Sequence, residues 1–416
     1  MLPSFSSPHR NLETGLRASQ SITFALLSIE LYFLLAKKRQ SEKGHLIMRT
    51  GIVNLPLHGG SAPPWLFGRM ARLAGEIVEA LVYEHGQKEF LRRISDPYWF
   101  QALACVLGFD WHSSGTTTVT VGALKMALSP ERHGIAVAGG KGKTSAKAPA
   151  DILAGAESFS LSSFKADELV RASRLSAKVD NALVQDGYQL YHHAFFFTER
   201  GDWAVVQQGM NASFARRYHW LSDCVQSFVE EPHSAICSQK RENSVLDLTA
   251  SASRENRKAT LDLVKDGPSH LHFAQRSLLD FSPCGSSPVP GLSMPRRHEL
   301  VALLDIDDAG RKALQMAYEL QPASYEELVA LKGLGPKRIR ALALISELIY
   351  GASPSWRDPA KFSFAHGGKD GTPFPVDRDT YDQSIRTLQE AIEGARMEKK
   401  EKYEAVKRLG RYTTNC

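Results

Sequence analysis

The spacing of apolar residues predicts a long helix soon after Pro63. In the segment WLFGRMARLAGEIVEALVYEHG, apolar residues recur every three or four positions, which places their side chains on one face of an α-helix. The residues on this face are Leu66, Met70, Leu73, Ile77, Val78 and Leu81. Similar patterns predict helices over residues 97–107, over KADELVRASRLSAKVDNALV and over ARRYHWLSDCVQSFVEE.

Other stretches have the composition of β-strands. A short strand is expected at residues 135–138, and YQLYHHAFFFT and WAVVQQG, joined by ERGD, form a predicted β-hairpin. Both faces of this hairpin are largely apolar, so we expect it to be buried. A turn at Arg200 and Gly201 gives the cross-strand pairs Thr198 with Trp203, Phe195 with Val206, and His193 with Gln208.

The order of these elements predicts an α+β, predominantly helical fold. At 416 residues the chain is long enough for two or three domains. We expect a mixed α/β domain at residues 48–237 with the hairpin at its centre, a connector rich in Ser, Pro and charge at 238–295, a helical module at 296–351, and a loop and basic helix at 352–416.

Residues 1–47 are interpreted as an extension that precedes a start at Met48. The apolar stretch SITFALLSIELYFLLA has 16 residues and contains Glu30. It is shorter than the roughly 20 apolar residues of a membrane-spanning helix. A signal anchor is the alternative for this segment.

The composition indicates a cytoplasmic, non-membrane protein with a mild preference for polyanions. The net charge is +6, which favours nucleic acid only where the cations are clustered. The five cysteines are odd in number and scattered, unlike the cysteines of a secreted disulfide framework.

A glycine- and lysine-rich stretch, GIAVAGGKGKTSAK, resembles half of a nucleotide-binding loop. That loop requires G-x-x-x-x-G-K-[ST] between a strand and a helix, but Val137 stands where the first glycine belongs and Pro149 delays the next helix. The alternatives are a surface turn, or a loop whose backbone N–H groups and lysines Lys141 and Lys143 hold a nucleic-acid backbone.

A second phosphate-binding pattern lies in SYEELVALKGLGPKRIRALALISELIYG. Ser324 and Glu327 form a capping box, and Pro336 opens the following helix. Gly333 and Gly335 let backbone N–H groups approach a phosphate at the positive end of that helix. These features are typical of a helix-hairpin-helix DNA-binding module, whose cations here are Lys332, Lys337, Arg338 and Arg340. A structural helical hairpin without a ligand is the alternative.

Long motifs also give the chain a resemblance to a whole family. It is similar to the archaeal and bacterial domain-of-unknown-function family 763 over about residues 48–382. The resemblance implies a helix-hairpin-helix module attached to a larger domain of undetermined activity. The motifs are MRTGIVNLPLHGGSAPPWLF, SDPYWFQALACVLGFDWHSSG, GGKGKTS, SAKVDNALVQDGYQLYHHAFFF, WAVVQQGMN, ARRYHWLS, EPHSAIC and FAHGGKDGTPFPVDRDTYD.

The end of the hairpin opposite its turn gathers candidate catalytic residues. Asp186, His192 and His193 are candidates for acid–base roles, and Asp180, Asp186 and His193 for Mg²⁺ or Mn²⁺ ligands. The strand that follows reads QQG and lacks the lysine of restriction-type nucleases. A hydrogen-bonded polar core is the alternative.

Two further groups of residues are candidates for chemistry. The glycine loop SFAHGGKDG offers His366, Lys369 and Asp370 as acid–base, cation and ligand, or is an exposed turn. A zinc site with H-x4-C-x8-H-x3-C spacing is a lesser alternative, because its gaps are wider than zinc modules usually show and helical core cysteines are the commoner explanation. Its residues are His219, Cys224, His233 and Cys237.

These patterns predict a DNA-binding protein, and most directly a metal-dependent nuclease of DNA repair or processing. The alternatives are a non-catalytic DNA-structure-binding or scaffold protein and, less directly, a nucleotide-dependent enzyme. The sequence does not indicate the oligomeric state.

Overall fold

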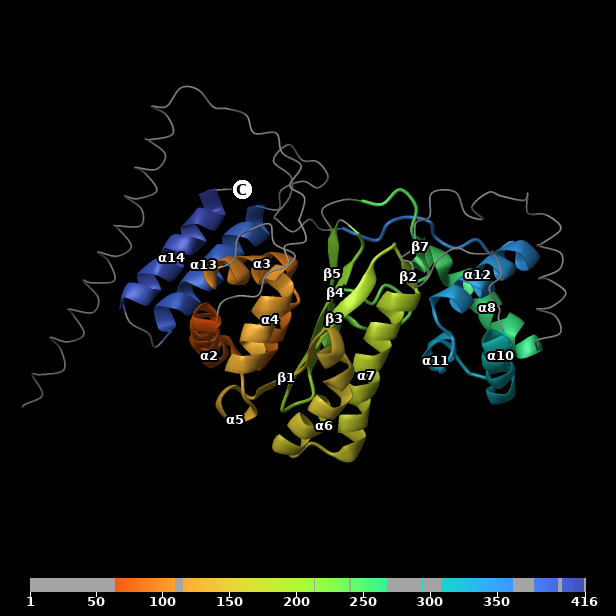
Figure 1. Cartoon of the computed structure of the whole chain (residues 1–416), viewed down its shortest axis with the longest axis horizontal. Coiled ribbons are helices and arrows are strands. Elements are labelled where there is room, and N and C mark those ends of the chain that lie inside the picture. The colour runs from red at the N-terminus through yellow and green to blue at the C-terminus, as the bar shows by residue number, and fades with distance from the viewer. Residues whose placement is uncertain are drawn as a thin grey trace, which may run out of the picture. The chain divides into compact units, whose positions relative to one another are not determined.

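The computed structural model divides the chain into two compact units, Met1–Ile52 and Val53–Cys416. All described residues belong to the second unit (Figure 1). The predicted extension at residues 1–47 and half of the predicted connector lie outside the described residues. The described residues are 64–108, 115–212, 214–238, 241–267, 294, 308–361, 378–395 and 399–414.

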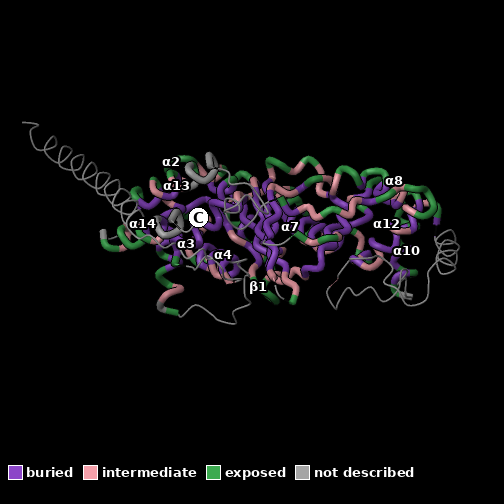
Figure 2. The backbone as a smooth tube through the Cα atoms, turned by 90° about the horizontal axis from the view of Figure 1, so that it is seen from above, coloured by how far each residue is buried: buried purple, intermediate pink, exposed green. Residues whose placement is uncertain are grey.

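A five-stranded antiparallel sheet contains the predicted hairpin as two adjacent strands. Consecutive apolar residues in the hairpin place apolar side chains on both faces of the sheet, so both faces can be covered, and the strands β3 and β4 are mostly buried. Figure 2 shows a buried band through this part of the chain. In order across the sheet the strands are β1 (Ile135–Lys141), β3 (Gln189–Thr198), β4 (Trp203–Met210), β5 (Ala215–Leu221) and β6 (Ala235–Ser238).

The two faces of the sheet belong to two hydrophobic cores. Phe195 and Phe197 pack into one core, which includes residues of α6 and α7. Ala194 and Phe196 point into the other, which includes residues of the N-terminal helices and of the last two helices. The helices covering the first face are α6 (Ala148–Ser158) and α7 (Ser163–Ala182). The helices of the second core are α2 (Pro64–Ile94), α3 (Pro97–Val106), α4 (Gly115–Ala127), α13 (Arg378–Gly394) and α14 (Lys399–Thr414).

A helical module continues the first core beyond α7. Its helix α8 lies within the predicted connector and packs on α12, where Asn256 donates to the carbonyl of Ala343 at 2.8 Å and Thr260 contacts Ser346 at 3.0 Å. The part of the predicted connector that forms α8 is therefore integral to the module. The helices are α8 (Arg254–Asp266), α10 (Asp308–Leu320), α11 (Tyr325–Ala330) and α12 (Pro336–Tyr350). Short elements complete the described fold: α5 (Pro130–His133), β2 (Val184–Gln185), β7 (Leu246–Asp247), η1 (Gly142–Lys147), η2 (Ser222–Cys224) and η3 (Ser251–Ser253).

Two local predictions were wrong. The helix expected from residue 215 is strand β5 followed by η2, because its alternate residues enter two different buried environments. The hairpin register is displaced by one residue, because Thr198 N–H bonds to the carbonyl of Asp202 and lengthens the turn. His193 consequently pairs with Gln207, not with Gln208.

The α+β, predominantly helical fold is as predicted, with the hairpin at the centre of the sheet. Across the part of the chain that the structure describes, no helix is long and apolar enough to cross a membrane.

Candidate functional site

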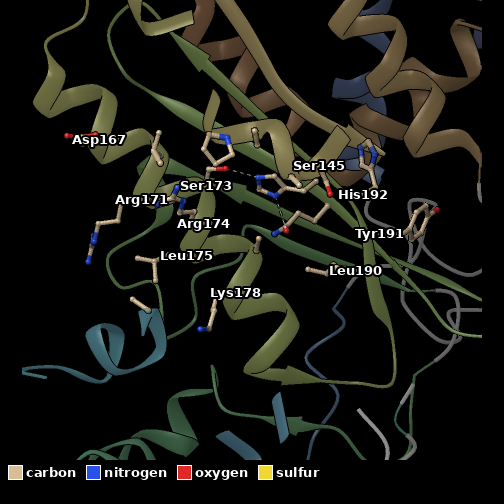
Figure 3. Close-up of a pocket in the computed structure, with 18 residues that line it drawn as sticks. Ser145, Asp167, Arg171, Ser173, Arg174, Leu175, Lys178, Leu190, Tyr191 and His192 are labelled. Atoms are coloured by element: carbon tan, nitrogen blue, oxygen red, sulfur yellow. Dashed lines mark hydrogen bonds between the residues drawn. The ribbon is translucent and has the colours of Figure 1, made fainter. Parts of the chain in front are cut away.

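A cavity of about 900 Å³ lies beside α7 (Figure 3). Residues of η1 and the first turn of α6 form one part of its wall, and β3 contributes residues from Leu190 to His193. Ala330, the last residue of α11, reaches its far side. The lysine-rich segment, through Ser145 and Ala146, and the helical hairpin, through Ala330, therefore border the same cavity, while their glycines and lysines lie outside its lining.

A chain of hydrogen bonds runs inward from this cavity. Ser173 Oγ on α7 lies 2.8 Å from Nε2 of His193, and Nδ1 of that histidine lies 3.0 Å from Oε1 of Gln207. Gln207 Nε2 donates to Oδ2 of Asp180 at 2.6 Å. Ser173, His193 and Gln207 line the cavity, whereas Asp180 lies behind them in the core.

Asp180 determines which group donates and which accepts in each of these hydrogen bonds. Trp220 Nε1 donates to it at 3.1 Å and His233 Nε2 contacts it at 2.5 Å. Burial raises the pKa of Asp180, and the neighbouring His233 opposes that rise. A carboxylate only accepts hydrogen bonds, so the Gln207 amide must turn its N–H to Asp180 and its carbonyl to His193. The network therefore assigns the ring proton to Nδ1 and leaves Nε2 to accept from the Ser173 hydroxyl.

Two histidines stand in the cavity wall in the neutral state. Burial lowers the pKa of His193 to about 4. Burial, with His193 and Lys141 nearby, lowers the pKa of His192 to about 3. Neither nitrogen of the His192 ring has a hydrogen-bond partner among the residues that the structure describes, although His192 is only 1% exposed. Figure 3 shows this ring beside Ser145. An unpaired buried imidazole in the wall of a cavity is available to a ligand.

Asp186 belongs to a different network. Its carboxylate accepts from Arg216 Nη1 at 3.0 Å and from the Tyr218 hydroxyl at 2.6 Å, and Arg216 also pairs with Asp358 at 2.7 Å. Burial raises the pKa of Asp186 to about 6, and the Arg216 guanidinium opposes this rise. Asp186 does not line the cavity, so the structure separates it from the predicted partners His192 and His193.

The predicted metal ligands are not assembled. No three His, Cys, Asp or Glu side chains form a group suited to a metal ion anywhere in the described ranges. Asp180, Asp186 and His193 are each engaged in hydrogen bonds. The divalent-metal prediction therefore has no preformed ligand set among these residues.

The zinc spacing also does not produce a site. His219 lies in strand β5 and not in a helix; its Nε2 accepts from Arg217 at 2.9 Å. His233 contacts Asp180, as described above. Cys237 is buried, which raises the pKa of its thiol to about 12, while Cys224 is exposed. These groups are used separately within the fold.

The glycine-rich stretch is a strand followed by a 3₁₀ helix. Gly139 has φ +83, and a Cβ there would meet the backbone oxygen of His193 at 2.3 Å. This close approach allows β1 to pair with β3 beside the catalytic candidates. Lys141 and Lys143 are exposed, and neither has a hydrogen-bond or ion-pair partner among the described residues. Thr144 lies in η1 and precedes the start of α6 at Ala148, unlike the threonine of a nucleotide-binding loop.

The helical hairpin has the predicted cap and turn. Ser324 Oγ accepts from Glu327 N at 3.2 Å, and α12 begins at Pro336. Gly333 has φ +94, and a Cβ at this position would meet the Cβ of Ala313 at 2.9 Å. The glycine is thus required by the turn itself.

The cations of the hairpin divide into two groups. Lys332 is exposed and Lys337 is half-buried. Arg338 donates to the carbonyl of Gly333 and steadies the turn. Arg340 is 4% exposed and donates to Gln185 Oε1 at 2.9 Å, so its predicted phosphate contact is incompatible with this structure.

Ser173 was missed by sequence reasoning, although a signal was present. Ser173, Ser176 and Asp180 recur at spacings of three and four on the buried side of α7, where apolar residues would be expected. Polar residues on the inner face of a helix must find partners there. The predicted residues His366, Lys369 and Asp370 lie outside the described residues.

Comparison with known proteins identifies a family for the chain but no activity. No curated protein and no solved structure matches the chain. A family described as a protein of unknown function, DUF763, matches residues 51–376, which is more than half of the sequence. The chain therefore belongs to the DUF763 family.

Proposed function

We propose that this protein binds the phosphodiester backbone of DNA along the surface that joins η1, α7 and the turn between α11 and α12. One observation carries the proposal: the two segments with phosphate-binding patterns border one cavity. Lys178 on α7 joins this helix to the helical-hairpin segment, because its Nζ donates to the carbonyl of Leu331 at 2.7 Å.

The charges around the cavity favour an anion. Arg174 is exposed on α7 and has no ion-pair partner among the described residues, as is also true of Lys143 in η1 and Lys332 after α11. Arg171 is paired with Glu326, so it contributes less net charge. Unpaired cations on adjacent segments support binding to a backbone of regularly spaced phosphates.

The lysines support sequence-tolerant binding. Lysine side chains contact the phosphate charges and cannot distinguish one base from another. The affinity for DNA is therefore expected to fall steeply with salt concentration and to vary little with the DNA sequence. A non-catalytic scaffold and a DNA-processing enzyme share this property, and they differ only in turnover.

Fluorescence anisotropy with labelled single-stranded, duplex and flap DNA, titrated over a range of salt concentrations, tests the proposal. Lys143→Glu should reduce the magnitude of the salt slope by about 1 and weaken binding to all sequences. Lys88→Glu is the matched control, because Lys88 is exposed on α2, whose core lies on the other face of the sheet. Equal effects of the two substitutions, or no salt-dependent binding by the wild type, would refute the proposal.

A further inference from the structure

We propose that Ser173 is a nucleophile, that His193 is its general base, and that the cavity takes a phosphodiester. This inference rests on the proposed function for the source of the phosphodiester, which is the DNA backbone. It goes beyond binding by assigning a covalent reaction to named atoms.

The geometry of the pair matches an activated hydroxyl. Oγ of Ser173 and Nε2 of His193 are 2.8 Å apart, within reach for proton transfer. A third group orients the base, because the carbonyl of Gln207 accepts the Nδ1 proton at 3.0 Å. Nucleophile, base and orienting group in this order form the arrangement used by hydroxyl nucleophiles on unrelated folds.

A comparison within α7 separates this pair from an ordinary buried hydrogen bond. Ser176, one helical turn later, is 0% exposed and donates to the carbonyl of Ser173 at 3.1 Å. This hydrogen bond lies within α7, and Ser176 does not line the cavity. Ser173 and His193 instead face a space large enough for a nucleotide-sized group.

The surroundings of the pair select an anionic substrate. The first turn of α6 contributes Ala148 and Pro149 to the wall. His192 offers an unpaired imidazole in the same wall, and Arg174 adds a cation. These groups can hold the non-bridging oxygens of a phosphodiester while Ser173 approaches the phosphorus.

The reaction balances with water as the second reactant. Ser173 Oγ attacks the phosphorus and its proton passes to His193 Nε2. The bond from phosphorus to the leaving oxygen breaks, and that oxygen takes the proton from His193. Water then attacks the seryl phosphodiester, giving its proton to His193. The bond to Ser173 breaks and the hydroxyl regains its proton, leaving a phosphate monoester and an alcohol.

The test compares Ser173→Ala with the matched control Ser176→Ala in the full chain. Turnover is measured on bis(p-nitrophenyl) phosphate and on labelled DNA, with Mg²⁺, with Mn²⁺ and with EDTA, and DNA affinity is measured in parallel. Ser173→Ala should lose at least about 10²-fold in turnover while keeping its DNA affinity. Ser176→Ala should keep both. Acid-quenched wild-type protein should carry a phosphodiester adduct that peptide mass spectrometry places on Ser173.

The outcomes distinguish this inference from the proposed function. Wild-type turnover in Ser173→Ala, or DNA binding with no turnover and no adduct under any metal condition, would overturn the nucleophile and leave DNA binding intact. Cleavage of the small diester without DNA binding would support Ser173 and refute the proposed function. Ser173-dependent cleavage of p-nitrophenyl acetate but not of the diester would overturn the substrate class. If Ser173→Ala does not fold, the wild-type adduct decides the question.

Discussion

Gln207 donates its side-chain N–H to Asp180 across 2.6 Å, joining strand β4 to helix α7. The bond has a consequence at the cavity, because it determines which end of the amide faces His193. A buried carboxylate thus sets the proton position on an imidazole that it does not touch.

Replacing Asp180 by Ala should destabilise the fold strongly. The change removes the common acceptor of Gln207, Trp220 and His233, all in the core. Breaking a buried pair by removing one partner costs about 3 kcal/mol or more. Urea denaturation should show this loss in the free energy of unfolding.

Asp167→Ala is the control for that measurement. Asp167 is exposed at the rim of the cavity, so its removal should change the free energy of unfolding by no more than about 0.5 kcal/mol. Similar losses in the two variants would show that Asp180 does not organise the core.

Two glycines of the helical hairpin should respond differently to substitution by Ala. Gly333 has φ +94 and no room for a Cβ, so Gly333→Ala should destabilise the protein by at least about 1 kcal/mol. Gly335 has φ −91 and nothing within 4 Å of its Cβ position, so Gly335→Ala should fold normally.

DNA binding gives the second half of this comparison. The Gly335 N–H donates to the carbonyl of Gly333 at 3.0 Å, so a phosphate at this turn would pack against the glycine Cα. If it does, the added Cβ of Gly335→Ala weakens binding without loss of stability. Thermal melting and anisotropy on the same samples separate the two effects. Unchanged affinity in Gly335→Ala would remove this glycine from the interface.

Arg340 and Lys332 lie eight positions apart and should have opposite phenotypes. Arg340 donates to Gln185 in the core, so Arg340→Ala should lower the free energy of unfolding by about 1–3 kcal/mol and leave the salt slope of DNA binding unchanged. Lys332 is exposed, so Lys332→Ala should preserve stability and reduce the magnitude of that slope by about 1. A reduced slope in Arg340→Ala would mean that its guanidinium reaches the DNA.

The pattern of apolar residues predicted helices that are buried on one face and strands that are buried along their whole length. The helix spacing located α2 and most of α7, and the apolar run around Phe195 located β3. The pattern failed at β5, because Arg216 and Arg217 are both fully buried although charge usually indicates an exposed position. The turn after Thr198 determines the pairing register of β3 and β4, and residue types alone do not specify the length of that turn.

The candidate site is formed by residues that are far apart in the sequence, so only part of it was predicted. His193 was identified from the polar end of the hairpin, but its contacts with Ser173 and Gln207 join α7, β3 and β4. The separation of Asp186 from His193 follows from its pairing with Arg216 on β5, the strand expected to be a helix. The error in secondary structure therefore became an error in the site.

Because buried histidines are held neutral in the fold, we expect the protein to lose stability on acidification. The pKa of His193 is lowered to about 4, against about 6.5 in an unfolded chain, so between these values the unfolded state binds more protons. Its contribution to stability is fully present above about pH 6.5 and is lost as the pH falls toward 4. At pH 5 the loss is about 2 kcal/mol. The titratable and charged groups around the cavity are Asp167, Arg171, Arg174, Lys178 and Asp180 from α7, Tyr191 and His192 from β3, and Lys141 from β1.

Urea denaturation at pH 7.5 and at pH 5 measures this effect as a difference between variants. Burial raises the pKa of Asp180 and Asp186, so these groups oppose the histidine in the wild type and the total change is not diagnostic. His193→Gln should lose about 2 kcal/mol less than the wild type between the two pH values, whereas Ser176→Ala, which keeps the histidine, should follow the wild type. Parallel losses in His193→Gln and wild type would show that His193 is not held neutral in the folded protein, and the assignment of Nε2 as a base would fail with it.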